Sequence, residues 1–272
     1  MPIAHNRTVE LYWKSVGAGP AVLLIAGQAM TLEAWWRTVP RLARSFRVLR
    51  FDNRGVGRSS HWPWPYVVSQ MADDAIAVLD AARVETAHIY GISLGGMVAQ
   101  EIALRYPHRV SAVILGATMA GGPEATLAQP EALSFFIRAG AMAPEEAEWA
   151  AVPYSYSLRT RRRHGDRIAQ DIARRVQNKT EMATYLHQVG AASVHNTSGR
   201  LGLIKAPTLI VHGDEDLIMP PENAYHLANE IPNAELKLWP DAAHLYTTDE
   251  PKADLYVRRF LEAHTAATRA VR

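Results

Sequence analysis

The sequence predicts an α/β protein: a doubly wound, mostly parallel sheet that carries an inserted helical cap. Over most of the 272 residues, β-rich runs alternate with amphipathic helical stretches. Central runs such as Ala21–Ala26 and Val110–Leu115 are apolar throughout, which is typical of parallel strands with helices on both faces. The alternation fails between about residues 121 and 203, and this interruption predicts the cap.

Short runs of apolar and β-branched residues bounded by turn residues predict seven strands. They are Val9–Trp13, Ala21–Ala26, Phe46–Phe51, Ala87–Tyr90, Val110–Leu115, Thr208–His212 and Glu235–Trp239. Helical periodicity between and after these runs predicts the covering helices. They are Thr31–Ala43, Gln70–Ala82, Leu94–Tyr106 and Lys252–His264.

The interrupted span opens at Gly121-Gly122-Pro123 and contains no convincing strand. Its helical patches are Glu131–Gly140, Pro144–Ala150, Arg167–Gln177 and Thr180–Ala192. Strand–helix alternation resumes after Ala206. We therefore expect a core formed by residues 1–120 and 204–272 and a helical cap formed by residues 121–203.

Composition excludes several classes of function. Hydrophobic residues make up 48% and charged residues 21% of the chain, as in a packed globular protein, and the net charge of +2 does not favour nucleic acid binding. Cysteine is absent, which excludes thiol nucleophiles and thiolate metal sites. The first ten residues lack a secretory signal pattern, and the apolar runs are too short to span a membrane. We expect a cytoplasmic protein with a small-molecule substrate, without cofactor, metal or membrane span, and able to form a homodimer.

The most informative segment is Gly91-Ile-Ser93-Leu-Gly95, which lies between a predicted strand and a predicted helix. Gly-x-Ser-x-Gly at such a junction is typical of a nucleophile elbow, a turn so tight that only small residues fit two positions before and after the serine. The turn exposes the serine hydroxyl above the N-terminus of the helix, where developing negative charge is stabilised. Ser93 is the predicted nucleophile.

A serine hydroxyl requires a base, and the base requires a carboxylate that orients it. For this elbow the expected chain order is Ser, Asp or Glu, His. Asp214 and Asp216 follow the strand Thr208–His212, and His244 follows the strand Glu235–Trp239. Parallel strands place such loops at the carboxyl edge that also carries Ser93. His244 is the predicted base, with Asp214 or Asp216 as its partner.

The chain resembles the α/β-hydrolase superfamily, in its branch of small capped esterases, enol-lactonases and cofactor-free haloperoxidase-like enzymes. Four stretches carry the resemblance: residues 24–28 (Leu-Ile-Ala-Gly-Gln), 51–59 (Phe-Asp-Asn-Arg-Gly-Val-Gly-Arg-Ser), 91–96 (Gly-Ile-Ser-Leu-Gly-Gly), and 212–216 (His-Gly-Asp-Glu-Asp) with Ala243-His244. The family's Gly-x-x-Asp-x-x-x-Pro turn aligns with Asp216 as the acid, and Asp214 is its rival.

The resemblance also implies an oxyanion hole formed by the backbone N–H groups of Leu94 and Gln28. Relatives usually have His-Gly where this chain has Ala26-Gly27, but the donor is a main-chain amide, so the exchange affects local packing more than the hole itself. The glycine-rich segment Asp52–Ser59 lacks a P-loop lysine, and the family uses it as a supporting turn rather than a phosphate site.

Aromatic residues concentrate in the cap and the entrance loops, and they either line an apolar pocket or form the core of a small helical subdomain. The candidates for substrate binding are Trp35, Trp62, Trp64, Phe135 and Tyr154. The basic stretch Arg159–Arg167 either attracts an anionic substrate or is a solvated face.

We interpret the sequence as a serine hydrolase that cleaves a carboxylic ester through an acyl-enzyme intermediate. An enol-lactonase or other lactonase, or a cofactor-free perhydrolase, would use the same three residues. A protein of this fold can also keep these residues and act as a ligand-binding receptor with little turnover.

Overall fold

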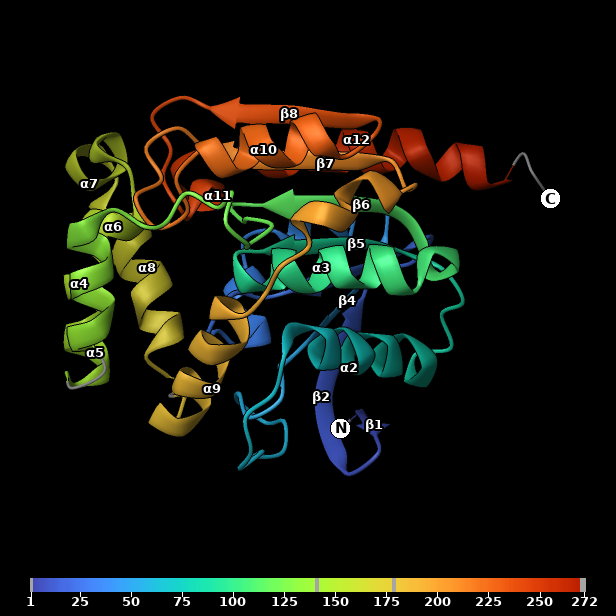
Figure 1. The fold of residues 1–272 in the computed structure, drawn as a ribbon, viewed down its shortest axis with the longest axis horizontal. Helices are drawn as coiled ribbons and strands as arrows, with labels where there is room; N and C mark the ends of the chain where they lie inside the picture. The colour runs from blue at the N-terminus through green and yellow to red at the C-terminus, as the bar shows by residue number, and fades with distance from the viewer. Residues whose placement is uncertain (1, 140–141, 178–179, 270–272) are drawn as a thin grey trace.

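A computed structural model describes residues 2–139, 142–177 and 180–269. Residues 1 and 270–272 of the expected core, and Gly140 at the end of one expected helix of the cap, lie outside the described residues. Eight strands form one sheet in the order β1-β2-β4-β3-β5-β6-β7-β8 (Figure 1). Their bounds are β1 Ile3–Asn6, β2 Val9–Val16, β3 Ala21–Ile25, β4 Arg47–Phe51, β5 Ala87–Ile92, β6 Val110–Gly116, β7 Thr208–Gly213 and β8 Ala234–Trp239. The pairings β1–β2 and β2–β4 are antiparallel and the other five are parallel. The predicted doubly wound, mostly parallel sheet is confirmed.

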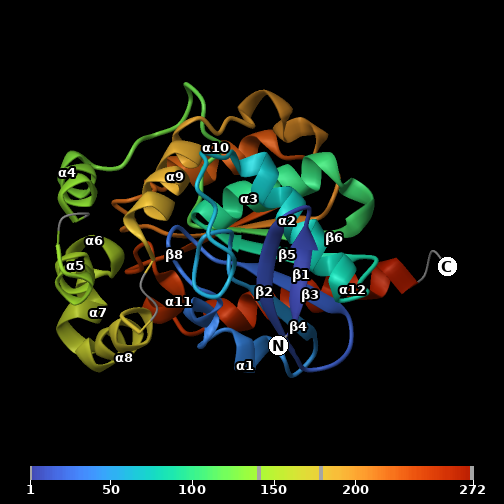
Figure 2. The same cartoon turned by 90° about the horizontal axis from the view of Figure 1, so that it is seen from below.

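Helices cover both faces of this sheet, and each face has its own hydrophobic core. On one face α2 (Val68–Ala81), α3 (Leu94–Arg105) and α10 (Glu222–Glu230) pack through side chains such as Met71, Val98 and Leu227. On the other, α1 (Val39–Leu42) and α12 (Ala253–Arg269) pack through Leu42 and Val257. Figure 2 shows α3 and α1 on opposite sides of the strands. No helix among the described residues combines the length and the apolar character that crossing a bilayer demands.

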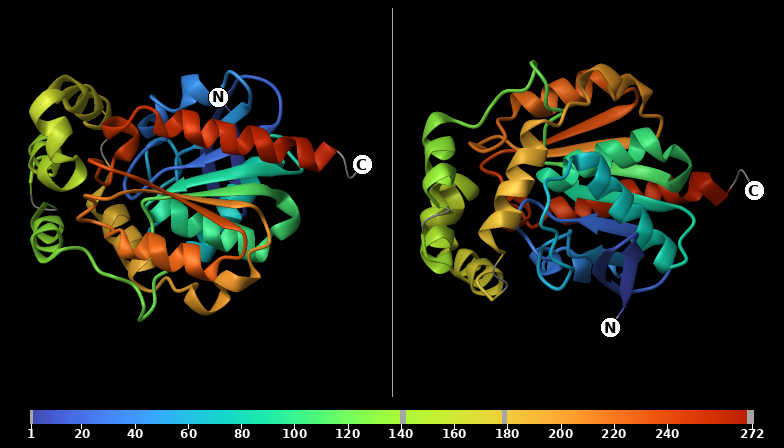
Figure 3. Two further views of the ribbon diagram at one scale, coloured as in Figure 1. Left: turned by 90° about the horizontal axis from the view of Figure 1, so that it is seen from above. Right: turned by 60° about the horizontal axis from the view of Figure 1, so that its bottom comes forward.

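Between β6 and β7 the described residues form helices and no named strand. The helices are α4 Pro130–Ala139, α5 Pro144–Ala150, α6 Val152–Ser155, α7 Leu158–Arg163, α8 Gly165–Arg175, α9 Met182–Ser193 and the 3-10 helix η3 Ser198–Leu203. In Figures 1 and 3, α4 to α8 stand beyond one end of the sheet, with α9 between them and the core. We call residues 121–203 the helical insertion.

The two ends of the insertion are joined to each other and to α3. Gly121 and Asn196 form an antiparallel bridge, and the N–H of Thr197 donates to the carbonyl of Ala120 at 2.8 Å. The hydroxyl of Thr197 donates to the fully buried Gln100 of α3. Because α3 begins directly after Ser93, this stem fixes the base of the insertion to the helix that follows the elbow.

Two features of the core differ from the sequence prediction. The expected helix Thr31–Ala43 is instead a 3-10 turn, η1 (Leu32–Trp35), followed by the short α1. Pro40 lacks an N–H and stands in the first turn of α1, where it allows a helix to start but not to continue from a preceding one. The sequence analysis also missed β1, a four-residue strand on the edge of the sheet that pairs only with β2.

Candidate active site

Ser93 lies in a strained turn between β5 and α3. Its backbone has φ 57° and ψ −123°, outside the helical and extended regions that side-chain-bearing residues prefer. A Cβ atom at Gly91 would overlap the carbonyl oxygen of Gly95, and one at Gly95 would overlap the carbonyl oxygen of Ile25. The two glycines of the motif are therefore sterically required, as expected for a nucleophile elbow.

The backbone around Ser93 is held from both sides. Its N–H donates to the carbonyl of Gly116 at 2.9 Å, and its carbonyl accepts the hydroxyl of Thr118 at 2.8 Å. Leu94 is the first residue of α3, so its N–H belongs to the first turn, whose donors lack an intrahelical acceptor. This is the geometry in which a backbone N–H can stabilise an oxyanion next to the serine.

His244 and Asp216 form a buried hydrogen-bonded pair. Nδ1 of His244 lies 2.8 Å from Oδ2 of Asp216, and the two residues are 6% and 2% exposed. The other carboxylate oxygen accepts the N–H groups of Ile218 and Met219, each at 2.9 Å. Asp214, the rival acid, is exposed at the surface. Of the two candidates, the turn after β7 brings Asp216 to the histidine.

The environment of Asp216 favours its ionised form. Burial by itself raises the pKa of this carboxyl, but the facing His244 imidazole and the hydrogen bonds from His212 and His244 outweigh burial, so the pKa lies well below its usual range. A charged carboxylate that accepts a hydrogen bond from Nδ1–H keeps the proton on Nδ1 and leaves Nε2 of His244 as the basic nitrogen.

His212 is a second imidazole on the same carboxylate, and the sequence analysis assigned it no role. Its Nε2 lies 2.6 Å from the carbonyl of Met219 and 3.3 Å from Oδ2 of Asp216, and its side chain is fully buried. Both neighbours are acceptors, so Nε2 carries a proton. The sequence did hold a signal for this contact, because His212 stands only four residues before Asp216 in the same turn.

The loop that carries His244 extends from β8 back to β5. Tyr246, two residues after His244, shares a 2.8 Å hydroxyl–hydroxyl hydrogen bond with Tyr90, three residues before Ser93. Both tyrosines are fully buried. This contact brings the histidine loop and the elbow to the same part of the carboxyl edge, although two strands, β6 and β7, lie between β5 and β8 in the sheet.

Gln28 lies in the loop after β3 at that same edge. The neighbouring Ala29 donates its N–H to Oε1 of Gln188 in α9 at 2.6 Å and accepts the hydroxyl of Thr180 at 2.8 Å. Gly27 lies against Ser93, because a Cβ at Gly27 would be 3.3 Å from Cβ of the serine. The loop predicted to supply the second oxyanion donor therefore lies next to Ser93 and is hydrogen-bonded to the insertion.

The glycine-rich segment after β4 is a supporting turn. Asp52 accepts the N–H of Leu32 at 2.7 Å through one oxygen and the N–H of Arg58 at 3.0 Å through the other. Farther along, Arg54 forms a bidentate ion pair with Asp74 of α2, at 2.6 and 2.8 Å. The carboxylates of Asp52 and Asp74 both bind groups of the surrounding chain, as expected if the segment Asp52–Ser59 supports the fold and binds no phosphate.

The five aromatic candidates for substrate binding lie in different surroundings. Trp35 is 3% exposed and packs edge-on against Tyr90 in the core. Trp64 is 67% exposed, whereas Trp62 is partly buried beside Arg54. Phe135 and Tyr154 stack on each other within the insertion, with ring centroids 5.1 Å apart. The contacts of Trp35 are those of a core side chain. That the other four line a substrate pocket stays a prediction.

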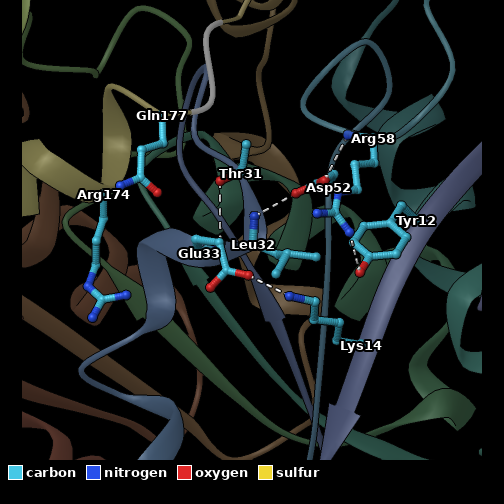
Figure 4. Close-up of a pocket in the computed structure, with 9 residues that line it drawn as sticks. All are labelled: Tyr12, Lys14, Thr31, Leu32, Glu33, Asp52, Arg58, Arg174 and Gln177. Atoms are coloured by element: carbon cyan, nitrogen blue, oxygen red, sulfur yellow. Dashed lines mark hydrogen bonds and ion pairs between the residues drawn. The ribbon is translucent and has the colours of Figure 1, made fainter. Parts of the chain in front are cut away.

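A polar cavity of about 220 Å³ lies where the insertion meets strand β2 and the loops after β3 and β4 (Figure 4). Its lining is mostly charged or polar: Tyr12, Lys14, Thr31, Leu32, Glu33, Asp52, Arg58, Arg174 and Gln177. Glu33 already pairs with Lys14 at 2.7 Å. The lining includes none of Ser93, Asp216 and His244, so this cavity is distinct from the candidate catalytic residues.

Comparison with known proteins places the chain in a family. The sequence model of the α/β hydrolase fold matches residues 20–251. A relative from Agrobacterium fabrum, named as the carbamate hydrolase RutD, is 27% identical over 93% of this chain and 96% of its own.

Two solved structures are similar over nearly the whole chain. The enol-lactonase from Burkholderia xenovorans LB400 has a TM-score of 0.84 with 25% identity, covering 96% of this chain and 100% of its own. A thermophilic esterase from Thermogutta terrifontis has a TM-score of 0.81 with 26% identity, covering 96% and 97%. The family match, the sheet topology and these likenesses agree that this chain belongs to the α/β hydrolase family and is a hydrolase.

Proposed function

We propose that the protein is a serine hydrolase that cleaves carboxylic esters, with Ser93 as nucleophile, His244 as general base and Asp216 as the orienting carboxylate. The observation that carries the proposal is the buried 2.8 Å hydrogen bond between His244 and Asp216, in a loop tied to the strand that leads to the strained Ser93 turn. Nucleophilic catalysis explains a strained serine turn and an oriented imidazole at one edge of a sheet, whereas the packing of a core requires neither.

The proposed reaction has two halves. Ser93 attacks the ester carbonyl while Nε2 of His244 takes the hydroxyl proton, and the backbone N–H groups of Leu94 and Gln28 hold the oxyanion. His244 then gives the proton to the departing alcohol. In the second half His244 activates water, which releases the acid and regenerates Ser93.

We further propose that residues 121–203 act as a cap over this edge and that residues 1–120 and 204–272 act as the catalytic core. The stem at Gly121 and Asn196, and the bonds from α9 to the loop of Gln28, support this division. Specificity would then come from side chains of the insertion, Phe135 and Tyr154 among them.

Esters come first because the family's thermophilic esterase neighbour has the same architecture and the proposed residues can open any activated carbonyl. A lactone is the second candidate, because the match to the enol-lactonase neighbour covers 96% of this chain and all of the enol-lactonase. Carbamates enter the comparison through the name of the curated relative, although donation from nitrogen makes their carbonyl a weaker electrophile.

The test is steady-state turnover on aryl acetates and butyrates, simple lactones, an enol-lactone and an aryl carbamate, for wild type, Ser93→Ala and His244→Ala. We expect repeated turnover of aryl esters, and a loss of at least about 10⁴-fold in kcat for either variant. A preference of several orders of magnitude for the cyclic substrates or the carbamate would replace the ester assignment. Full activity of Ser93→Ala would overturn the mechanism.

Two further measurements sharpen the result. A fluorophosphonate probe should modify Ser93, identified by peptide mass spectrometry, and the modification should be slow in His244→Ala. A burst of about one equivalent of alcohol followed by no turnover would instead favour a receptor-like protein that retains its acyl group.

A further inference from the structure

The loop that carries His244 is hydrogen-bonded to the helical insertion on both sides of the histidine. The N–H of Leu245 donates to the carbonyl of Ser155 at 2.9 Å. The N–H of Ala243 donates to Oδ2 of Asp249 at 2.8 Å, and the same oxygen accepts the N–H of Ser157 at 3.0 Å. The segment Ser155–Ser157 joins α6 to α7, so the insertion and the histidine loop meet at one carboxylate.

Asp249 is well suited to fix these two backbone groups. It is 1% exposed, and it lies at the end of the short α11 (Tyr246–Asp249). Burial raises the pKa of its carboxyl, and the N–H groups of Ala243 and Ser157 oppose that rise by stabilising the charge. A carboxylate that accepts N–H groups forms stronger hydrogen bonds than a neutral acceptor. The link is therefore a specific one and not a general packing contact.

The basic stretch of the insertion adds contacts to the same loop. Arg159 lies 3.5 Å from a carboxylate oxygen of Asp241 and 3.8 Å from one of Glu250. Arg167 donates to the carbonyl of Thr248 at 3.4 Å. The arginines between them, residues 161–163, are exposed. Both ends of the stretch thus contact the loop from Asp241 to Glu250, and only its middle is a solvated face.

We propose that Asp249 is a positioning residue, through which the segment Ser155–Ser157 of the insertion holds the His244 loop in its productive place. The proposal rests on the proposed function, because it takes His244 to be the base. Asp249 itself contacts no reacting atom. Its effect comes from geometry, since a displacement of about 1 Å at a catalytic group costs about 100-fold in rate.

Ser157 allows a matched pair of variants. Its φ is −61° and the preceding Tyr156 is extended (φ −126°, ψ 144°), so proline fits the backbone at position 157 while removing the N–H that Asp249 accepts. Ser157→Ala keeps that N–H. Both variants lose the hydroxyl that accepts the N–H of Thr160, so they differ only in the N–H to Asp249 and in the proline ring that replaces it. We expect kcat on a small aryl acetate to be about 10- to 100-fold lower in Ser157→Pro than in Ser157→Ala, with KM within about threefold.

A second pair changes the carboxylate. Asp249→Asn keeps an oxygen acceptor of the same shape, whereas Asp249→Leu removes it. We expect Asp249→Leu to lose about 10- to 100-fold in kcat and Asp249→Asn to recover most of that loss, with both variants folded by circular dichroism. If Asp249→Leu does not fold, the Ser157 pair decides the question alone.

The same assay includes His244→Ala, so the two proposals fail differently. Activity of His244→Ala equal to wild type would remove the proposed function. A loss in His244→Ala together with equal kcat in Ser157→Pro and Ser157→Ala would overturn the role of Asp249 and leave the base in place. A change confined to KM or to the melting temperature would also overturn it, because a merely structural link would move only those.

Discussion

Replacing Asp216 with asparagine tests how the candidate acid acts. One oxygen of Asp216 accepts the N–H groups of Ile218 and Met219, so the asparagine oxygen stays there and its NH₂ group takes the place of Oδ2. That NH₂ group then faces Nδ1 of His244 and Nε2 of His212. His212 keeps its proton, because the carbonyl of Met219 also accepts it at 2.6 Å. His244 must therefore present an unprotonated Nδ1.

The consequence is the wrong tautomer of the base. With Nδ1 as acceptor, the proton of His244 moves to Nε2, which can no longer accept the proton of Ser93. An asparagine in this role in other serine hydrolases lowers kcat by about 10⁴-fold, equivalent to about 5 kcal/mol in the activation free energy. The side chain of Asp216 is fully buried, and we place it out of contact with substrate, so KM should change little.

The assay is hydrolysis of an aryl acetate from pH 6 to 10, with Ser93→Ala as the control for background activity. A melting curve for each variant checks that it is folded. A loss in kcat near 10⁴-fold at neutral pH, with KM within about threefold, would fit the reasoning. If Asp216→Asn keeps more than a tenth of wild-type kcat at neutral pH, the carboxylate does not set the tautomer and this account of the site is wrong.

Three further predictions concern stability. Gly95→Ala should lower the free energy of unfolding, measured in denaturant, by at least about 3 kcal/mol, because its Cβ would overlap a backbone oxygen. Gly190→Ala in α9, where a Cβ has nothing within 4 Å, should raise it by about 0.5–1 kcal/mol. Arg54→Leu should lower the free energy of unfolding by about 3–5 kcal/mol, because it leaves the carboxylate of Asp74 buried without its partner. If the double variant, with both Arg54 and Asp74 replaced by leucine, is less stable than either single variant, this explanation is wrong. Burial lowers the pKa of His88 to about 4. The unfolded chain then binds the extra proton between pH 6.5 and 4, so stability should fall as pH falls through that window, by up to about 3 kcal/mol, and His88→Gln should flatten the slope in unfolding curves.

Much of the architecture could be predicted because it depends on local patterns. The central strands β3, β5, β6 and β7 follow largely apolar runs, because a parallel strand with helices on both faces of the sheet buries both of its own faces. The strands β2, β4 and β8 mix apolar and polar residues, and their short apolar or β-branched runs between turn residues predicted them. The elbow at Ser93 was also predictable, because the steric demand falls on glycines two positions away. β1 was missed because an edge strand of four residues carries little pattern of its own.

The sequence by itself therefore determined the sheet, the helical interruption and the serine turn, all of which depend on residues close together in the chain. Tertiary structure decided which carboxylate meets His244, although Asp214 and Asp216 are only two residues apart, and it placed His212 on the same oxygen. It also joined Ser157 to Asp249 across 92 residues. No local periodicity encodes such contacts, because they exist only once packing has brought distant loops to one edge of the sheet and buried their polar groups, which must then find each other as partners.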